Sequence, residues 1–229
     1  MACRVLALLL LHSNKVVRLD AIIDELWGND PPVSAVRTAQ TYIYQLRRHF
    51  SQEMPEAVGT LVTHSTGYQL RVAPGHLDLE TFTQLLGRGR AAMAADEPEV
   101  AAHTLRQALE LWSGRALSGV RQGRLIQAHA VHLEEQRCCA LELRIQADAR
   151  LNRHRELVGE LKALVLESPL DEWRHTELIK ALAHSGRRKE ALDAFQNLRS
   201  VLLEELGLDP SRQVQELHQD ILGGAISCQ

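Results

Sequence analysis

The chain has 229 residues, of which 45% are hydrophobic and 24% are charged, and these values exclude a wholly disordered protein and allow two small domains. A formal net charge of −3 excludes a protein that coats nucleic acid by bulk positive charge, although it is compatible with a local basic surface. The four cysteines, at positions 3, 138, 139 and 228, show no C-x-x-C spacing, which indicates a reduced, cytoplasmic protein.

The first residues, MACRVLALLLLHSNK, resemble a short signal peptide because Arg4 precedes an apolar run. His12 ends that run early, and no small-residue cleavage motif follows. No apolar run reaches the ~20 residues that a membrane span requires. We therefore interpret residues 2–12 as a helix of a cytoplasmic protein, broken by the SNK segment that follows.

Two further helices are predicted next in the chain. Residues 18–28 place apolar side chains on one face, and Gly28 is a stop signal. Pro31 and Pro32 then predict a turn, because proline fixes φ and disfavours helical geometry in the residue before it. A third helix is predicted over residues 34–50. Its inward stripe is expected to consist of Val36, Ala39, Ile43, Leu46 and Phe50.

The opposite face of this third helix carries side chains that can hydrogen-bond to phosphates or base edges. Residues 34–50 also contain Arg47 and His49, and this segment has no acidic residue. Residues 1–76 contain seven Lys or Arg and six Asp or Glu, a net charge of +1. The remaining residues contain 19 Lys or Arg and 23 Asp or Glu, a net charge of −4. The face is therefore a candidate DNA-binding surface. The alternative is an ordinary amphipathic helix whose arginines are merely solvated.

Two short strands around a turn with Gly67 are predicted over residues 61–72, directly behind this helix. Three helices followed by a hairpin make the winged helix-turn-helix pattern, in which a helix fits the major groove and the hairpin reaches the neighbouring minor groove or backbone. The three arginines of the helix would neutralise phosphates. Base contacts would come from Thr41, Gln45 and Tyr44.

From Leu79 onward the chain alternates helical runs with brief breaks, which predicts seven helices. A shift of 34 residues lays ARLNRHRELVGELKAL over AHSGRRKEALDAFQNL, and this is the tetratricopeptide period. Pro169 and Pro210 do not keep that offset, so the repeat is degenerate. The sequence thus predicts a mainly α protein, with a winged helix-turn-helix domain over residues 1–74 and a tetratricopeptide-like helical repeat domain over residues 77–224.

Several separated segments resemble the Streptomyces antibiotic regulatory proteins. DAIIDELWG, AQTYIYQLRR and HSTGYQLRV are similar to the OmpR-type DNA-binding domain of these regulators, and HLDLETF, EELGLDPS and VQELHQDIL to the bacterial transcriptional activation domain that follows it. The resemblance covers nearly the whole chain. It implies a transcriptional activator of a secondary-metabolite (antibiotic) gene cluster that binds tandem direct repeats in promoter DNA as a homodimer or multimer and contacts RNA polymerase.

The resemblance also assigns roles to residues of the third helix and the hairpin. The implied DNA-reading set is Arg37, Thr38, Thr41, Tyr44, Gln45 and Arg48. Arg47, and His64 in the wing, would touch the DNA backbone or the minor groove. Where relatives often carry arginine this chain has His64, so we expect a weaker and pH-dependent minor-groove contact.

OmpR-type domains usually begin with a small β-sheet, whereas this sequence begins at the first helix, so we expect that sheet to be missing. The alternative function is accordingly a helical-repeat interaction scaffold with impaired DNA binding.

No nucleophile, base or metal set converges, and we expect neither an enzyme nor a cofactor. His129 and His132 lie one helical turn apart, but without a carboxylate or thiol at ligand spacing we interpret them as surface or packing residues and expect no metal site.

Overall fold

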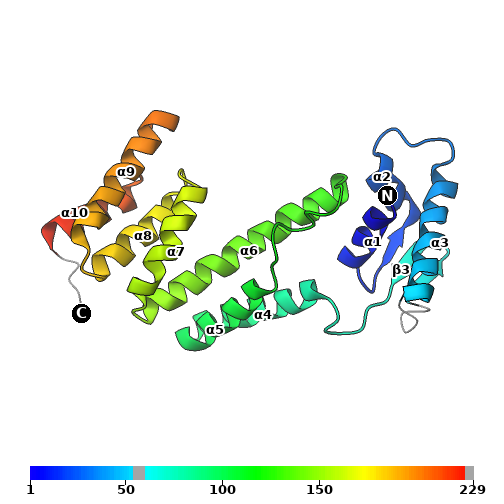
Figure 1. The fold of residues 1–229 in the computed structure, drawn as a ribbon, viewed down its shortest axis with the longest axis horizontal. Helices are drawn as coiled ribbons and strands as arrows, with labels where there is room; N and C mark the ends of the chain where they lie inside the picture. The colour runs from blue at the N-terminus through cyan, green and yellow to red at the C-terminus, as the bar shows by residue number, and fades with distance from the viewer. Residues whose placement is uncertain (54–59, 225–229) are drawn as a thin grey trace. The chain divides into compact units, whose positions relative to one another are not determined.

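The computed structural model describes residues 1–53 and 60–224, which exclude Cys228. Over these residues the chain is mainly helical with three short strands, and it forms two compact units, Met1–Gly89 with Thr104–Leu141 and Arg90–His103 with Glu142–Gln229. The helices, labelled in Figure 1, are α1 (Ala2–Leu11), α2 (Leu19–Trp27), α3 (Ala35–Glu53), α4 (Asp78–Ala94), α5 (Pro98–Glu110), α6 (Arg124–Arg150), α7 (His154–Glu167), α8 (Glu172–His184), α9 (Arg188–Leu206) and α10 (Arg212–Gly223). The strands are β1 (Val16–Arg18), β2 (Leu61–His64) and β3 (Gly67–Leu70). No helix in the described ranges is long and apolar enough to cross a bilayer.

The three strands form one antiparallel sheet in the order β1-β3-β2. Its register places Val17 of β1 opposite Tyr68 of β3, and Val62 of β2 opposite Gln69. The predicted hairpin is confirmed as β2 and β3, whereas β1 lies where the sequence pattern predicts only a break between two helices. Three residues are too few to show a period, and they form a strand only by pairing with β3, far along the chain.

Gly67 lies where β1 and β3 approach each other closely. A Cβ at this position would lie 2.0 Å from the carbonyl oxygen of Val17 and 2.8 Å from the Cα of Arg18. Both are backbone atoms that cannot rotate away, so any side chain would force the two strands apart. The glycine that serves as a turn signal in the sequence is therefore also required by the packing of the sheet.

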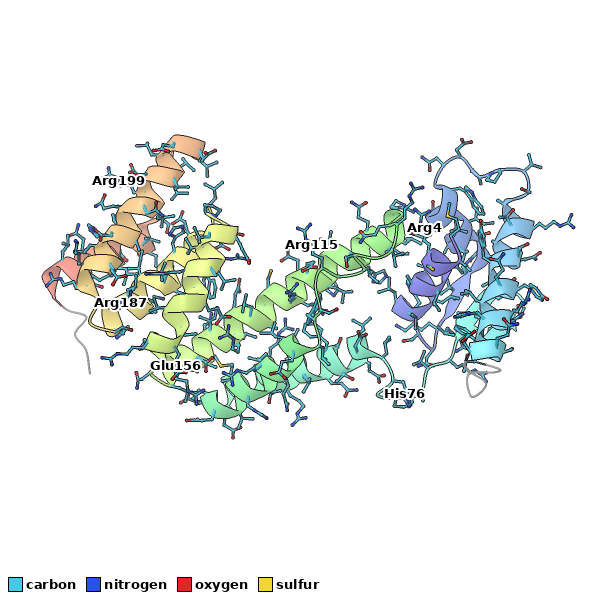
Figure 2. All side chains as sticks on the ribbon, viewed as in Figure 1. Arg4, His76, Arg115, Glu156, Arg187 and Arg199 are labelled. Carbon is cyan, nitrogen blue, oxygen red and sulfur yellow. The ribbon has the colours of Figure 1, made fainter. Side chains whose placement is uncertain are left out.

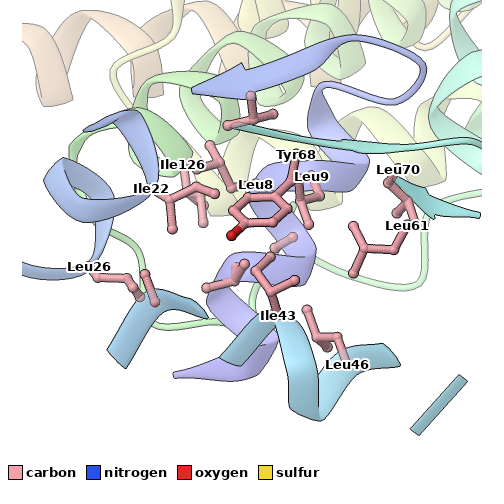
Figure 3. Packing of buried hydrophobic residues seen from close by; sticks show 14 residues of the cluster. Leu8, Leu9, Ile22, Leu26, Ile43, Leu46, Leu61, Tyr68, Leu70 and Ile126 are labelled. Atoms are coloured by element: carbon pink, nitrogen blue, oxygen red, sulfur yellow. The ribbon is translucent and has the colours of Figure 1, made fainter. Parts of the chain in front are cut away.

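One buried apolar cluster joins the first three helices to the sheet. Leu8 and Leu9 of α1, Ile22 of α2 and Ile43 of α3 are nearly or completely inaccessible to solvent, and Figure 3 shows them packed around the strands. Ile126 of α6 belongs to the same cluster, although it is distant in sequence. The first turn of α6 is therefore part of the core that supports α3.

A buried carboxylate from α2 caps that first turn of α6. Glu25 is only 2% exposed. Its Oε1 accepts a hydrogen bond from the backbone N–H of Gly123 at 2.6 Å, and its Oε2 accepts from Leu125 and Ile126 at 2.8 and 3.1 Å. Backbone N–H groups at a helix start have no partner within the helix, so one side chain here satisfies three of them. The negative charge also suits the positive end of the helix dipole.

Arg4 of α1 supplies the opposite charge beneath this cap. Its Nε lies 3.8 Å from Oε1 of Glu25, and both side chains are almost fully buried. The guanidinium also donates to the carbonyl oxygens of Arg121 and Leu26, both at 2.8 Å; Figure 2 labels Arg4 on α1. The two charges are thus hydrogen-bonded as well as paired, which is the condition for burying an ion pair without a large penalty.

The inward face of α3 differs from the predicted stripe at one position. Val36 is 48% exposed, while Ala35 is buried at 5% and takes the place expected for it. Ala35, Ala39 and Ile43 keep a spacing of four residues, so the side chain at 36 faces solvent. The start of the helix is therefore rotated relative to the prediction, and an apolar side chain lies on its outer side.

The helical segment from α4 to α10 has the seven helices that the sequence predicts. The repeat is also visible, because α7 begins at His154 and α9 at Arg188, 34 residues later. The partner helices α8 and α10 begin at Glu172 and Arg212, because α9 has 19 residues where α7 has 14. This longer helix, with a longer connection before Pro210, explains why Pro169 and Pro210 do not keep the 34-residue offset.

Three helix-to-helix junctions in this segment use the same left-handed turn. Asp96, Asn152 and Gly186 have φ values of +57°, +57° and +76°. In each case the next residue donates its N–H to a carbonyl five positions back, at 2.9 to 3.0 Å. This is the Schellman arrangement, which satisfies carbonyl groups at a helix end and reverses the chain. Helices α4, α6 and α8 therefore end in one common way.

One buried histidine is expected to make the stability of this segment depend on pH. His175 of α8 is 1% exposed, and its Nε2 lies 3.0 Å from the carbonyl oxygen of Pro169, to which it donates. Its Nδ1 has no hydrogen-bond partner in the described structure. Burial lowers the pKa of His175 below its ordinary value, and this outweighs the carboxylates of Asp171 and Glu172, which raise it.

We expect the free energy of unfolding to decrease as the pH falls below about 6.5, because the unfolded His175 takes up a proton there and the folded one does not. Each proton taken up on unfolding contributes up to ~1.4 kcal/mol per pH unit. Urea unfolding between pH 7.5 and 5.5, followed by circular dichroism, measures this slope. His175→Gln should flatten it, whereas His103→Gln, at an exposed position of α5, is the matched control. An unchanged slope in His175→Gln contradicts the assignment.

Candidate nucleic-acid interface

The outer face of α3 presents a continuous row of polar side chains to solvent. Positions 37, 41, 44 and 48 are spaced by four, three and four residues, so they share one side of the helix. Arg37, Thr41 and Arg48 are exposed there, and Tyr44 is 66% exposed. Acidic residues are absent from α3 up to its last residue, Glu53. The helix therefore offers two exposed cations, a phenol and a hydroxyl on one accessible surface.

Gln40 lies on the same exposed face and is missing from the predicted DNA-reading set. It is three residues after Arg37 and four before Tyr44, so helical spacing alone places it on this side. Gln45, which was predicted, is also exposed, at the edge of the row. Either carboxamide can make the paired hydrogen bonds that recognise adenine in the major groove. Helical periodicity in the sequence is therefore sufficient to place Gln40 on this face.

Two threonines of α3 are partly engaged within the helix. The hydroxyl of Thr41 donates to the carbonyl oxygen of Arg37 at 2.9 Å, so it presents its oxygen lone pairs and its methyl group to the outside. Such a methyl group is suited to contact the methyl group of thymine. Thr38 is half-buried and lies 3.4 Å from the hydroxyl of Ser34, so it is the least accessible residue of the predicted set.

Arg47 connects α3 to the wing. Its Nε and Nη2 donate to the carbonyl oxygen of Leu61 in β2 at 3.2 and 2.9 Å, and Nη2 also donates to Oγ1 of Thr63 at 2.7 Å. The side chain is half-buried, unlike that of Arg48, which is exposed. In this structure Arg47 therefore holds β2 against α3, and the exposed cations of the row are Arg37 and Arg48.

His64, at the end of β2, is also held within the wing. Its Nε2 donates to Oε1 of Gln69 on the neighbouring strand at 3.0 Å. Gln69 in turn donates to the carbonyl oxygen of Asn14 at 2.8 Å, which ties β3 to the segment before β1. The imidazole ring is half-buried, and its hydrogen bond to Gln69 uses Nε2 rather than Nδ1. The structure thus places His64 in the sheet that orients the wing.

His129 of α6 packs against another aromatic ring, whereas His132 is exposed. The rings of His129 and His12 meet edge to face with their centroids 4.9 Å apart. Burial lowers the pKa of His129, and the positive charges of protonated His12 and His132 lower it further. Within the described parts of the chain, no group of three His, Cys, Asp or Glu side chains is arranged to hold a metal ion.

Known proteins with this arrangement are regulators of transcription. Residues 2–70 match the family described as "Transcriptional regulatory protein, C terminal", and residues 77–222 match the "Bacterial transcriptional activator domain". Regulatory protein DnrI of Streptomyces peucetius is 41% identical over 224 residues, which cover 96% of this chain and 82% of DnrI. The chain belongs to the Streptomyces antibiotic regulatory protein family.

Two longer proteins contain a similar unit. Regulatory protein AfsR of Streptomyces coelicolor is 39% identical over 218 residues, which cover 95% of this chain but 21% of AfsR. The structure of Mycobacterium tuberculosis EmbR in complex with a low-affinity phosphopeptide has a TM-score of 0.86 and 30% identity, and it covers 97% of this chain and 59% of the EmbR chain. A winged helix-turn-helix followed by a helical domain is therefore the shared fold, and the chain is a transcriptional regulator.

Proposed function

We propose that this protein is a sequence-specific transcriptional activator of a secondary-metabolite gene cluster. In this proposal residues 1–74 bind promoter DNA through α3 and the wing, and residues 77–224 form the domain that contacts RNA polymerase. Two copies bind as a homodimer on tandem direct repeats. The supporting observations are the family membership and the names of its relatives, which include regulatory protein DnrI and transcriptional regulator RedD of Streptomyces coelicolor.

The observation that carries the proposal is the exposed, acid-free outer face of α3. Arg37 and Arg48 supply positive charge for phosphates, and the side chains between them supply hydrogen-bonding groups of the kinds that read base edges. Helix α3 is held from behind by the buried cluster and from the side by Arg47. A rigid helix with a polar outer face beside a hairpin is the geometry that major-groove recognition requires.

We assign the residues of this interface to four roles. Arg37 and Arg48 bind phosphates, and Thr41, Tyr44, Gln45 and Gln40 face the bases. Thr38 and His64 lie at the margins of the contact, near the helix start and in the wing. Arg47 acts as a positioning residue, because its hydrogen bonds fix β2 against α3.

Replacing both exposed arginines is expected to weaken binding and reduce its salt dependence. Each phosphate contact contributes about 0.9 to the slope of log K against log salt, so Arg37→Ala/Arg48→Ala should lower the slope by about 2 per protomer. Electrophoretic shifts at several salt concentrations, with promoter DNA of a neighbouring biosynthetic cluster, measure this. Arg155→Ala, an exposed arginine of α7, is the matched control. Salt-independent or absent binding by the wild type supports the interaction scaffold instead.

The base-reading role is tested separately. Thr41→Ala/Gln45→Ala should weaken binding to the direct repeats by about tenfold or more, because one good base contact is worth ~1–3 kcal/mol. Binding to a scrambled DNA of the same length should change by less than about twofold, because the phosphate contacts remain. Equal affinity of the double variant and the wild type for the direct repeats means that the assigned reading face is wrong.

A further inference from the structure

We propose that Arg18 of β1 is the cation with which the wing binds a DNA phosphate. This inference rests on the proposed function, because it concerns the same complex with promoter DNA. The hairpin itself, residues 61–70, contains no lysine or arginine. His64 is its only basic side chain, and that ring already donates a hydrogen bond to Gln69. A wing that neutralises a phosphate therefore needs positive charge from outside the hairpin.

The strand register places Arg18 at the tip of the wing. Gly67, the first residue of β3, pairs with Arg18 on one side and with His64 on the other. Arg18 is therefore level with the turn that joins β2 to β3. The N–H of Leu19, the next residue, donates to the carbonyl oxygen of Thr66 in that turn at 3.1 Å. The strand pairing and this hydrogen bond together fix the backbone of Arg18 beside the turn.

The side chain of Arg18 lies on the face of the sheet that points away from the core. Residues directly paired in an antiparallel sheet project from the same face, so Arg18 and His64 share one face, with Gly67 between them. Glycine has no side chain that could separate or cover them. The neighbouring pair, Val17 and Tyr68, projects from the other face and is buried at 5% and 8% exposure. The wing tip thus carries one accessible arginine.

One exposed acid holds the guanidinium of Arg18. Its Nη2 donates to Oδ2 of Asp20 at 3.1 Å, and the two side chains are 71% and 81% exposed. An ion pair this open to water is weak, so a phosphate can compete for the guanidinium, which suits phosphate oxygens. Asp20 opposes DNA binding, because it occupies Arg18 in the free protein and repels the phosphate. The pair therefore provides two variants with opposite expected effects.

The experiment measures the affinity of the whole chain for promoter DNA by fluorescence anisotropy at several salt concentrations. Arg18→Ala should lower the slope of log K against log salt by about 0.9 per protomer and weaken binding roughly three- to tenfold at about 0.1 M salt. Arg18→Lys should keep the wild-type slope, because lysine also neutralises a phosphate. Asp20→Asn should strengthen binding by up to about fivefold, the range of an exposed ion pair. That gain should be smaller in Arg18→Ala/Asp20→Asn, where no guanidinium is released.

Lys15→Ala is the matched control, because it removes an exposed cation at the other end of the same sheet. There the N–H of Asn14 donates to the carbonyl oxygen of Leu70 at 2.9 Å, away from the wing tip. This variant should leave the slope unchanged. Circular dichroism checks the fold of each variant, and Arg18→Gln replaces Arg18→Ala if the alanine variant does not fold.

The proposal is overturned if the folded Arg18 variant keeps the wild-type slope, or if Lys15→Ala lowers the slope equally. Arg18→Lys binding as weakly as Arg18→Ala also overturns it, because the contact would then need the shape of arginine rather than its charge. Salt-dependent binding that Arg37→Ala/Arg48→Ala reduces and Arg18→Ala does not would overturn the wing contact alone, leaving the proposed function intact. Absent or salt-independent binding by the wild type overturns both.

Discussion

Glu25→Ala is expected to lower the free energy of unfolding by about 3–5 kcal/mol, the range for removing one partner of a buried ion pair. The loss has two sources. Three N–H groups at the start of α6 would be left without their acceptor, and Arg4 would remain buried without its counter-charge. Unsatisfied buried polar groups cost more than the hydrogen bonds themselves contribute. A change of this size is a large fraction of the stability of a small domain.

The neighbouring residue provides the control. Asp24 forms an ion pair with Arg124 at 2.8 Å, but the arginine is largely exposed, and such pairs contribute about 1 kcal/mol or less. Urea unfolding followed by tryptophan fluorescence and circular dichroism should therefore show a much larger shift for Glu25→Ala than for Asp24→Asn. Glu25→Gln, which keeps the shape but not the charge, should fall between them. Equal shifts for Glu25→Ala and Asp24→Asn rule out the cap as a major source of stability.

Asp148→Ala is expected to destabilise the helical segment by a similar amount, about 3–5 kcal/mol. Asp148 is 3% exposed and pairs with Arg144 at 3.3 Å and with Arg153 at 2.9 Å. Arg144 is itself buried and also pairs with Glu160 of α7. Without Asp148, the buried charge of Arg144 would face only Glu160, whose side chain is half-exposed. The junction between α6 and α7, where Arg153 also donates its N–H to the Asp148 carbonyl, would lose its side-chain support.

A charge-free double replacement separates lost pairing from lost packing. Arg144→Met/Asp148→Leu removes both charges and keeps apolar volume, and such replacements of buried pairs are often neutral or stabilising. We expect the double variant to recover most of the stability that Asp148→Ala loses, as measured by thermal and urea unfolding. Asp209→Ala, in the exposed pair with Arg199, should shift the midpoint little. A double variant as unstable as Asp148→Ala would show that packing, not an unpaired charge, sets the cost.

Periodic patterns in the sequence were sufficient to predict individual helices and the helical repeat. The spacing of Ala39, Ile43 and Leu46 defined α3, and the 34-residue shift defined the α7 and α9 starts. The same kind of reasoning could have included Gln40 in the exposed row. It failed at Val36, because a one-residue ambiguity at a helix start cannot be resolved without knowing which neighbour packs beneath it.

Features that depend on distant pairing were beyond the sequence patterns. Strand β1 exists only through Val17 facing Tyr68, and the role of Arg47 depends on where Leu61 lies after folding. Glu25 looks like an ordinary charged residue of α2, and nothing local indicates that it caps α6. Such features follow from tertiary structure, in which long-range contacts override local preference.

The common left-handed turn at Asp96, Asn152 and Gly186 has a consequence for how such a domain can change over evolutionary time. Because α4 and α5, α6 and α7, and α8 and α9 are joined by the same kind of turn, such a pair can be duplicated or deleted without redesign of the turn inside it. Helical repeats of this kind derive their stability mainly from adjacent helices, so the chain tolerates variation in length. The activator domain can thereby be enlarged or shortened by whole helix pairs.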